Sequence, residues 1–160
     1  EVDHPWQDYD WTPVAVIPGA QQIEEWCEID SGPGWVRYHC ATLDIELHRK
    51  ETEAYLVNLS NEPPRIFVIL TESEDEAAPY DVEPFLVTAS SYEVQDYLDS
   101  SEDIIEGVPM PAGVIAWVSE FVERHHVDEP FKKRKQKSYN PEESGFGRPP
   151  EILRKGRRLD

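Results

Sequence analysis

The sequence has few cysteines and no long apolar run, and each shortage excludes a class of protein. Its two cysteines, Cys27 and Cys40, are too few for the disulfide frameworks of small secreted domains. No apolar stretch approaches the roughly 20 residues that a transmembrane helix needs. Residues 1–4 lack the basic start and apolar stretch of a signal peptide. We therefore expect a soluble protein, although the chain begins at Glu1 rather than at Met, which leaves an upstream targeting segment as an open question.

Motifs that carry catalytic chemistry are also missing. The sequence contains no Gly-x-Ser-x-Gly nucleophile elbow, no glycine-rich phosphate loop and no dinucleotide-binding fingerprint. The five histidines and two cysteines show none of the spacings typical of zinc sites; His39 and Cys40, for example, are adjacent on an expected strand and face opposite ways. The sequence therefore predicts no catalytic residues, no metal site and no cofactor, and we expect that the protein is not an enzyme.

The chain does have a large excess of acidic residues, and they are unevenly distributed. It carries 33 Asp and Glu against 15 Lys and Arg, a formal net charge of -18. Residues 127–160 contain ten basic and six acidic residues, a net charge of +4, which leaves -22 for residues 1–126. The apolar fraction of 39% is too high for a wholly disordered acidic chain. We therefore predict an acidic α+β domain over residues 1–126 and a basic tail, punctuated by Pro and Gly, over residues 127–160.

The basic tail is the first candidate binding segment. Phe131 is followed by Lys132, Lys133, Arg134, Lys135 and Lys137. These charges suit an acidic protein surface, either of a partner or of the protein's own body. A simple solvated tail is the plainer alternative, whereas the strongly negative body disfavours binding to nucleic acid.

Two tryptophans near the start of the chain are the second candidate. Trp6 and Trp11 precede the first expected strand, in a segment too short to form a core of its own. Tryptophan is enriched where proteins meet, so both are predicted to contact a partner. The alternative is that both rings cover the open end of a sheet.

Short apolar stretches rich in β-branched and aromatic residues fill residues 12–90, separated by Pro, Gly, Asn and Asp. This pattern predicts antiparallel strands joined by turns, including a turn at residues 31–34. Residues 66–70 are apolar on both faces and should form the central strand. The expected strands are residues 14–17, 23–29, 35–40, 43–48, 54–59, 65–70 and 85–88.

Two helices are expected after this region. Ser90 and Glu93 have the spacing of a capping box, so a short helix should run from about residue 91 to residue 99. Residues 104–110 should be a link, and Pro111 suits the first turn of a second helix. The sequence thus predicts a single α+β domain: an antiparallel, barrel-like or strongly twisted sheet of about six or seven strands, capped by C-terminal helices and followed by the basic tail.

Acidic side chains offer an alternative function. Asp44 and Glu46 lie on one face of the expected strand 43–48, beside His48. Ligand binding or acid-base chemistry there requires a pocket that shields the carboxylates from water. A face that alternates charged and apolar residues is usually solvated, so a small-molecule binding protein or enzyme is the alternative to a protein-binding role.

Several motifs together resemble one known family. They are residues 11–19, 53–59, 103–111 and 121–126, followed by the basic run at residues 132–135. The combination is similar to a proteobacterial domain family of unknown function, whose genes are often neighbours of formate dehydrogenase genes. The similarity extends from about residue 6 to residue 147. It implies a cytoplasmic accessory protein, assembly factor or small subunit that contacts a subunit of a molybdenum- or tungsten-dependent formate dehydrogenase, and it implies no catalytic residues.

Overall fold

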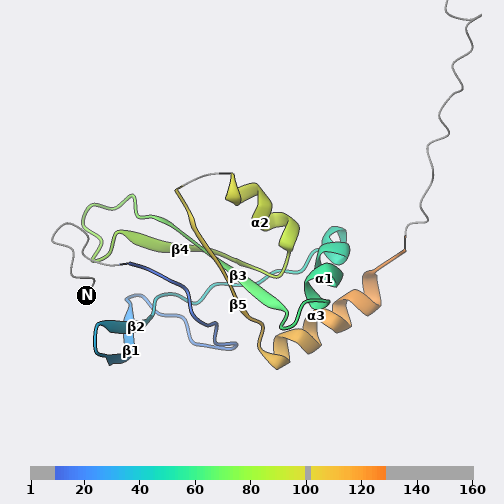
Figure 1. Ribbon diagram of the computed structural model, residues 1–160, viewed down its shortest axis with the longest axis horizontal. Helices are drawn as coiled ribbons and strands as arrows, with labels where there is room; N and C mark the ends of the chain where they lie inside the picture. The colour runs from blue at the N-terminus through green and yellow to red at the C-terminus, as the bar shows by residue number, and fades with distance from the viewer. Residues whose placement is uncertain (1–9, 100–101, 129–160) are drawn as a thin grey trace, which may run out of the picture. The chain divides into compact units, whose positions relative to one another are not determined.

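The computed structural model describes residues 10–99 and 102–128 of the chain (Figure 1). In chain order the elements are β1 (Cys27–Gly32), β2 (Trp35–His39), the short 3-10 turn η1 (Arg49–Glu51), α1 (Thr52–Leu59), β3 (Arg65–Glu72), β4 (Val82–Thr88), α2 (Ser91–Leu98), β5 (Ile104–Pro109) and α3 (Ala112–His125). Apart from Val127 and Asp128, the predicted basic tail lies outside the described residues, so the boundary at residues 126 and 127 stays a prediction.

β1 and β2 form a two-stranded antiparallel sheet, which we call the hairpin. Pro33 and Gly34 connect the two strands, so the turn predicted at residues 31–34 is confirmed. Gly34 adopts a φ of 79°, which suits the second central residue of a type II turn and which glycine accepts without strain. The register shifts between Glu28 and Asp30, so Ile29 lies at an irregularity in the ladder.

β3 is the central strand of the second sheet, which has the order β4-β3-β5 and antiparallel pairing throughout. The central position predicted for residues 65–70 is confirmed. Ile66 and Leu70 are buried on one face of this strand, and Ile69 is buried on the other. The register between β3 and β4 shifts between Ile69 and Leu70, and Leu70 lies opposite Pro84. Proline is tolerated there because β4 is an edge strand.

The predicted single barrel-like sheet of six or seven strands is wrong. The described residues hold five strands in two separate small sheets, and neither sheet closes into a barrel. Residues 14–17 and 43–48 form no strand. Val16, Ile45 and Leu47 still pack against the core, whereas Val14 and Ile17 are exposed. The alternating pattern of residues 43–48 therefore predicts which side chains turn inward but not strand pairing, because pairing also requires a neighbouring strand.

Two further segments differ from expectation in secondary structure. Residues 54–59, predicted as a strand, lie in α1, where Ala54, Tyr55 and Asn58 are buried at helical spacing. Residues 104–109, predicted as a link, form β5. Gly107 in this strand leaves room for the Arg65 side chain, because a Cβ atom at that position would lie 3.0 Å from Arg65 Cδ.

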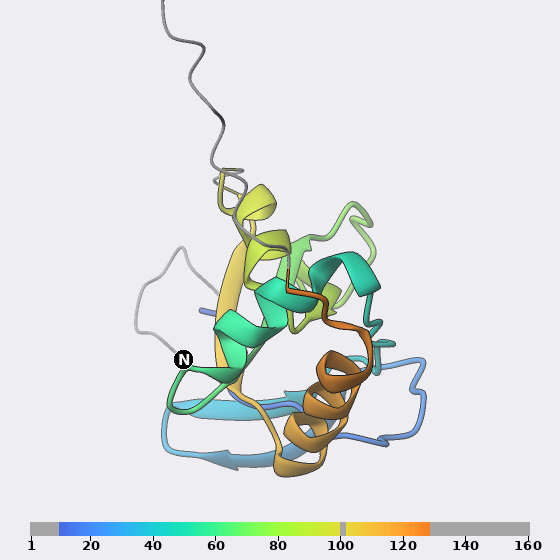
Figure 2. The ribbon, with the colours of Figure 1, turned by 90° about the vertical axis from the view of Figure 1, so that its right-hand side faces the viewer.

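Both predicted C-terminal helices are confirmed. Ser90 caps α2, since its Oγ accepts a hydrogen bond from the Glu93 N–H at 3.2 Å. α3 begins directly after Pro111. α1 lies between α2 and α3, as Figure 1 and Figure 2 show from two directions. No described helix combines the length and the apolar character that crossing a membrane requires.

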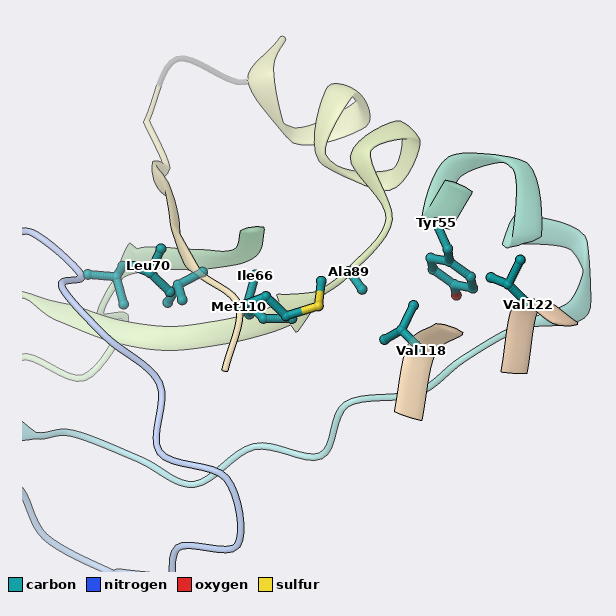
Figure 3. Close-up of a cluster of buried hydrophobic side chains, with 9 residues drawn as sticks. Tyr55, Ile66, Leu70, Ala89, Met110, Val118 and Val122 are labelled. Carbon is teal, nitrogen blue, oxygen red and sulfur yellow. The ribbon is translucent and has the colours of Figure 1, made fainter. Parts of the chain in front are cut away.

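The core joins α1, α3 and one face of the three-stranded sheet (Figure 3). Val118 and Val122 of α3 lie next to Tyr55 of α1, and Ile66 and Met110 continue the cluster along the sheet. Burying one such aliphatic side chain contributes about 1.5–3 kcal/mol. This packing fixes α1, and with it the η1 turn that immediately precedes it.

Candidate functional site

One of the eight predicted partner-binding residues lies in the described part of the chain. Trp6 and the tail residues Phe131, Lys132, Lys133, Arg134, Lys135 and Lys137 lie outside the described residues. Trp11 is described, and its indole is half-buried. Its Nε1 donates a hydrogen bond to Asp81 Oδ1 at 2.7 Å. Trp11 therefore packs within the protein, and a role in partner binding stays a prediction.

Trp11 belongs to a cluster of four aromatic rings, which we call the aromatic cluster. The other rings are Trp26 just before β1, Tyr38 of β2, and Tyr80 between β3 and β4. Trp26 stacks on Tyr80 with ring centroids 4.2 Å apart, and Trp11 meets these two rings edge-on at 5.1 and 5.2 Å. Stacked and edge-to-face pairs are favoured arrangements of aromatic rings. A hydrogen bond with Tyr80 raises the pKa of Tyr38. The cluster thus attaches the hairpin to the loop between β3 and β4.

Beyond the aromatic cluster, the hairpin is exposed on both faces. Most of its residues are exposed, including three large apolar ones: Ile29 at 51%, Trp35 at 45% and Val36 at 44%. Trp35 and Val36 are neighbours in β2, so their side chains project from opposite faces of the sheet. We call Ile29, Trp35 and Val36 the hairpin surface.

Contacts within the hairpin hold the exposed Trp35 ring in place. The ring lies over Gly32, where a Cβ atom would approach it to 2.7 Å. The guanidinium carbon of Arg37 is 5.4 Å from the ring centroid, and Arg37 also pairs with Asp30 at 3.4 Å. The other charged side chains of this segment are acidic: Glu24, Glu25 and Glu28. The hairpin surface is therefore apolar, its Trp35 ring is held in place, and acidic residues flank Ile29 in the sequence.

A cleft of about 670 Å³ lies between the η1 turn and α2, and we call it the α2 cleft. Its lining comes from two segments. His48, Arg49, Lys50 and Glu51 belong to η1 and the residue before it, and Tyr92, Glu93 and Asp96 belong to α2. Glu93 and Asp96 are three residues apart, so they share a face of the helix. One open cavity is thus bordered by both acidic and basic side chains.

Buried hydroxyl groups hold two carboxylates of the α2 cleft. Ser90 Oγ donates to Glu51 Oε2 at 2.6 Å, and Thr88 Oγ1 donates to Glu93 Oε2 at 2.6 Å. Both hydroxyl residues are buried. Within the described residues, Oε1 of each glutamate accepts no hydrogen bond. Each carboxylate is therefore fixed by one oxygen and keeps the other available.

The capping box is completed in a different way from the one predicted. The Ser90 N–H donates to Thr88 Oγ1 at 3.0 Å, and this hydroxyl in turn donates to the Glu93 carboxylate. Thr88 thus stands between the two groups that a capping box normally joins directly. Sequence spacing identifies Ser90 and Glu93 but gives no sign of Thr88 or of Glu51.

The acidic residues of the alternative site are not brought together in a pocket. His48 lines the α2 cleft, and its Nε2 is 3.6 Å from Glu46 Oε2, with both side chains exposed. Asp44 is exposed and does not line the cleft. The predicted face of segment 43–48 is therefore solvated, and only His48 of the three residues also lines the α2 cleft.

A buried tyrosine supports the chain beside the cleft. The backbone N–H of His48 donates to the Tyr55 hydroxyl at 3.0 Å. Burial raises the pKa of Tyr55, and the neighbouring charges of Glu51 and Glu93 raise it further. The Tyr55 phenol therefore stays protonated and acts as a neutral hydrogen-bonding support.

Metal-ligating and thiol groups are dispersed. In residues 10–99 and 102–128, no three His, Cys, Asp or Glu side chains gather in a way that could hold a metal ion. Cys27 and Cys40 are free thiols. Burial raises the pKa of Cys40, which favours the protonated and less nucleophilic form.

The chain also matches a known protein family. Residues 1–135 match the model of the family described as "Protein of unknown function (DUF3305)". The chain belongs to the DUF3305 family. No curated protein and no solved structure matches it. The predicted resemblance to a family of unknown function is thereby confirmed, whereas a proteobacterial origin and a link between this DUF3305 protein and formate dehydrogenase stay predictions.

Proposed function

We propose that this protein acts by binding another protein through the hairpin surface. The observation that carries the proposal is that Ile29, Trp35 and Val36 are about half exposed, on both faces of a two-stranded sheet. An isolated hairpin is marginally stable in water, and covering its apolar side chains removes that surface from contact with solvent. A rigid, exposed tryptophan is the typical anchor of such a contact.

The charges around the hairpin surface define the chemistry of its partner. Glu28 and Asp30 flank Ile29 in β1, Glu24 and Glu25 precede the strand, and Arg37 is the single Lys or Arg of β1 and β2. A complementary surface has an apolar centre and a basic rim. Because such charges accelerate association and are screened by salt, binding should slow as ionic strength rises.

The resemblance to a family encoded beside formate dehydrogenase genes supports a subunit of that molybdenum- or tungsten-dependent enzyme as the partner. The role is non-catalytic and cytoplasmic, as an assembly factor or a small subunit. The basic run of Lys132, Lys133, Arg134, Lys135 and Lys137, with Phe131 and Trp6, provides a separate contact to an acidic part of the partner.

A pair of tryptophan variants tests the hairpin surface against a matched control. Trp35→Ala should weaken binding to purified formate dehydrogenase by about 30-fold, the effect of losing roughly 2 kcal/mol at an interface anchor. Trp117→Ala removes a ring on α3 that is 42% exposed, so it controls for the loss of an exposed indole. Biolayer interferometry with the full chain measures both affinities.

Two outcomes test the binding surface and the choice of partner separately. Equal affinity of the wild type, Trp35→Ala and Val36→Asp for the enzyme would show that the hairpin surface is not the contact. If the chain does not bind the enzyme, and is absent from it at every stage of its maturation, the choice of formate dehydrogenase is wrong.

A second function, binding of a small molecule, is favoured by the α2 cleft. The carboxylates that support it are Glu51, Glu93 and Asp96, with His48 as the one member taken from the predicted alternative site. Preorganised polar groups around a concave surface are typical of ligand sites.

A further inference from the structure

The α2 cleft carries charges of both signs that do not pair with one another. Arg49 and Lys50 border it from η1, and Glu93 and Asp96 border it from α2. Neither cation forms an ion pair with any residue in the described part of the chain. A simple anion in this cleft would be repelled by the carboxylates, and a simple cation by Arg49 and Lys50. A molecule that carries both charges finds a complementary group for each.

We propose that the α2 cleft binds a small zwitterion with a primary ammonium group and a carboxylate group, the chemical class of the free α-amino acids. This inference rests on the second function above, and it is independent of protein binding at the hairpin surface.

The two glutamates suit the ammonium group. Ser90 and Thr88 hold Glu51 and Glu93 at Oε2, and Oε1 of each remains available as an acceptor. An ammonium N–H donates to such oxygens, and hydrogen bonds between charged groups are the stronger class. Because the carboxylates are already fixed, little rotamer freedom is lost on binding. A quaternary amine has no N–H donor and should bind more weakly.

The η1 turn suits the carboxylate group. The planar guanidinium of Arg49 can donate two parallel hydrogen bonds to one carboxylate, and Lys50 adds a second positive charge. A cavity of about 670 Å³ exceeds what the two charged groups need, which leaves space for an amino-acid side chain beside Tyr92. The cleft is open, so we expect a dissociation constant of about 1 mM, in the range of weak metabolite binding.

Titration of the isotope-labelled full chain with each standard free amino acid, up to roughly 10 mM, tests the proposal through NMR chemical shifts. The expected result is that at least one amino acid shifts amide signals of residues 48–51 and 90–96. Blocking either end of that amino acid, as its N-acetyl or its methyl amide derivative, should weaken binding by at least ten-fold. Arg49→Gln should weaken it by a similar factor, and so should Asp96→Asn, which removes the third negative charge that attracts the ammonium group to the cleft.

Matched variants outside the cleft keep the test specific. Glu53→Gln on α1 and Arg124→Gln on α3 remove the same charges at exposed positions that do not line the cleft.

The proposal is overturned if no amino acid shifts the cleft signals, if the shifts lie elsewhere, or if the N-acetyl derivative binds equally well. Glu93→Gln is avoided as the main test because it also breaks the bond to Thr88. Trp35→Ala should leave amino-acid binding unchanged. The two proposals, amino-acid binding in the α2 cleft and protein binding at the hairpin surface, can therefore fail independently.

Discussion

Asn58 is fully buried in α1, and its side-chain amide joins that helix to two other parts of the chain. Its Nδ2 donates to the carbonyl oxygens of Arg65 and Ala89, each at 2.7 Å, and its Oδ1 accepts the Arg65 N–H at 2.9 Å. Arg65 begins β3 and Ala89 follows β4. One side chain therefore fixes α1 to one end of the three-stranded sheet.

Asn58→Ala should destabilise the protein by about 3 kcal/mol, because it removes three hydrogen bonds of a fully buried side chain and leaves the buried Ala89 carbonyl without its partner. Urea unfolding followed by tryptophan fluorescence measures the loss. Ser60→Ala, which removes an exposed hydroxyl bonded to the Val57 carbonyl, should change stability by no more than about 0.5 kcal/mol. A similar effect of both variants would mean that the Asn58 hydrogen bonds contribute little.

The sequence signal for this residue is misleading. Asparagine is rarely buried, so residues 54–59, predicted as a strand, give no sign that Asn58 faces inward. The buried positions Ala54, Tyr55 and Asn58 have helical spacing, but that spacing becomes visible only when Asn58 is counted as an inward-facing residue.

At the scale of elements, the start of α2 contains two adjacent serines in opposite situations. Ser90 Oγ accepts the Glu93 N–H and donates to Glu51, whereas Ser91 Oγ is buried with no hydrogen-bond partner in the described part of the chain. The same chemical group is thus satisfied twice at one position and not at all at the next.

Ser90→Ala should destabilise the protein by about 2 kcal/mol, since it removes the helix cap and the donor that holds Glu51. Ser91→Ala should be neutral or slightly stabilising, because it removes a buried hydroxyl that has no partner. Thermal unfolding of the two variants side by side provides the comparison. Destabilisation of equal size in both would contradict the assignment of the cap to Ser90.

Strand β5 covers residues 104–109, which the sequence predicts to be a link. Gly107 and Pro109 are poor strand residues in general, and both are acceptable here because β5 is an edge strand. A Cβ atom at position 107 would crowd the side chain of Arg65, whose Nη1 donates to the Gly107 carbonyl at 2.6 Å. This preference for glycine comes from a residue of another strand, so local sequence cannot reveal it.

For the whole molecule, the aromatic cluster decides how the hairpin is attached. Trp26 lies immediately before β1, and its ring stacks on Tyr80 in the loop between β3 and β4. Tyr38 adds a second contact from β2, with ring centroids 5.4 Å from Tyr80. The hairpin itself is mostly exposed, so these rings supply much of the apolar contact that keeps it in place.

Trp26→Ala should release the hairpin without unfolding the three-stranded sheet. Amide hydrogen exchange in β1 and β2 should become at least ten-fold faster, while exchange in β3 stays within about two-fold of the wild type, because local opening requires only the local contacts to break. Mass-spectrometric hydrogen exchange resolves the two regions. Equal acceleration in β3 would mean that the aromatic cluster and the core unfold as one unit.

The sequence predicts more of the hairpin surface than of the α2 cleft. Turn residues at 31–34 and the β-branched and aromatic residues that follow predict the strand 35–40 and its turn, but not that both faces of the hairpin are exposed. In the α2 cleft, the Ser90 hydroxyl joins Glu51 to the start of α2, across 39 positions in the chain. Such a contact depends on α1 being a helix, which the sequence pattern does not predict.

Pro84 disfavours pairing of strand β4 with a strand from a second copy of this protein. An edge strand offers a row of donors to any second chain, and proline, which has no N–H, interrupts that row at the register shift opposite Leu70. Glu83 beside it adds a charge that another copy would have to bury. The hairpin strands contain no proline, since Pro33 lies in the turn. Strand β4 is thus a poor edge for pairing with a second copy, whereas, within the described residues, β1 and β2 pair only with each other and contain no such interruption.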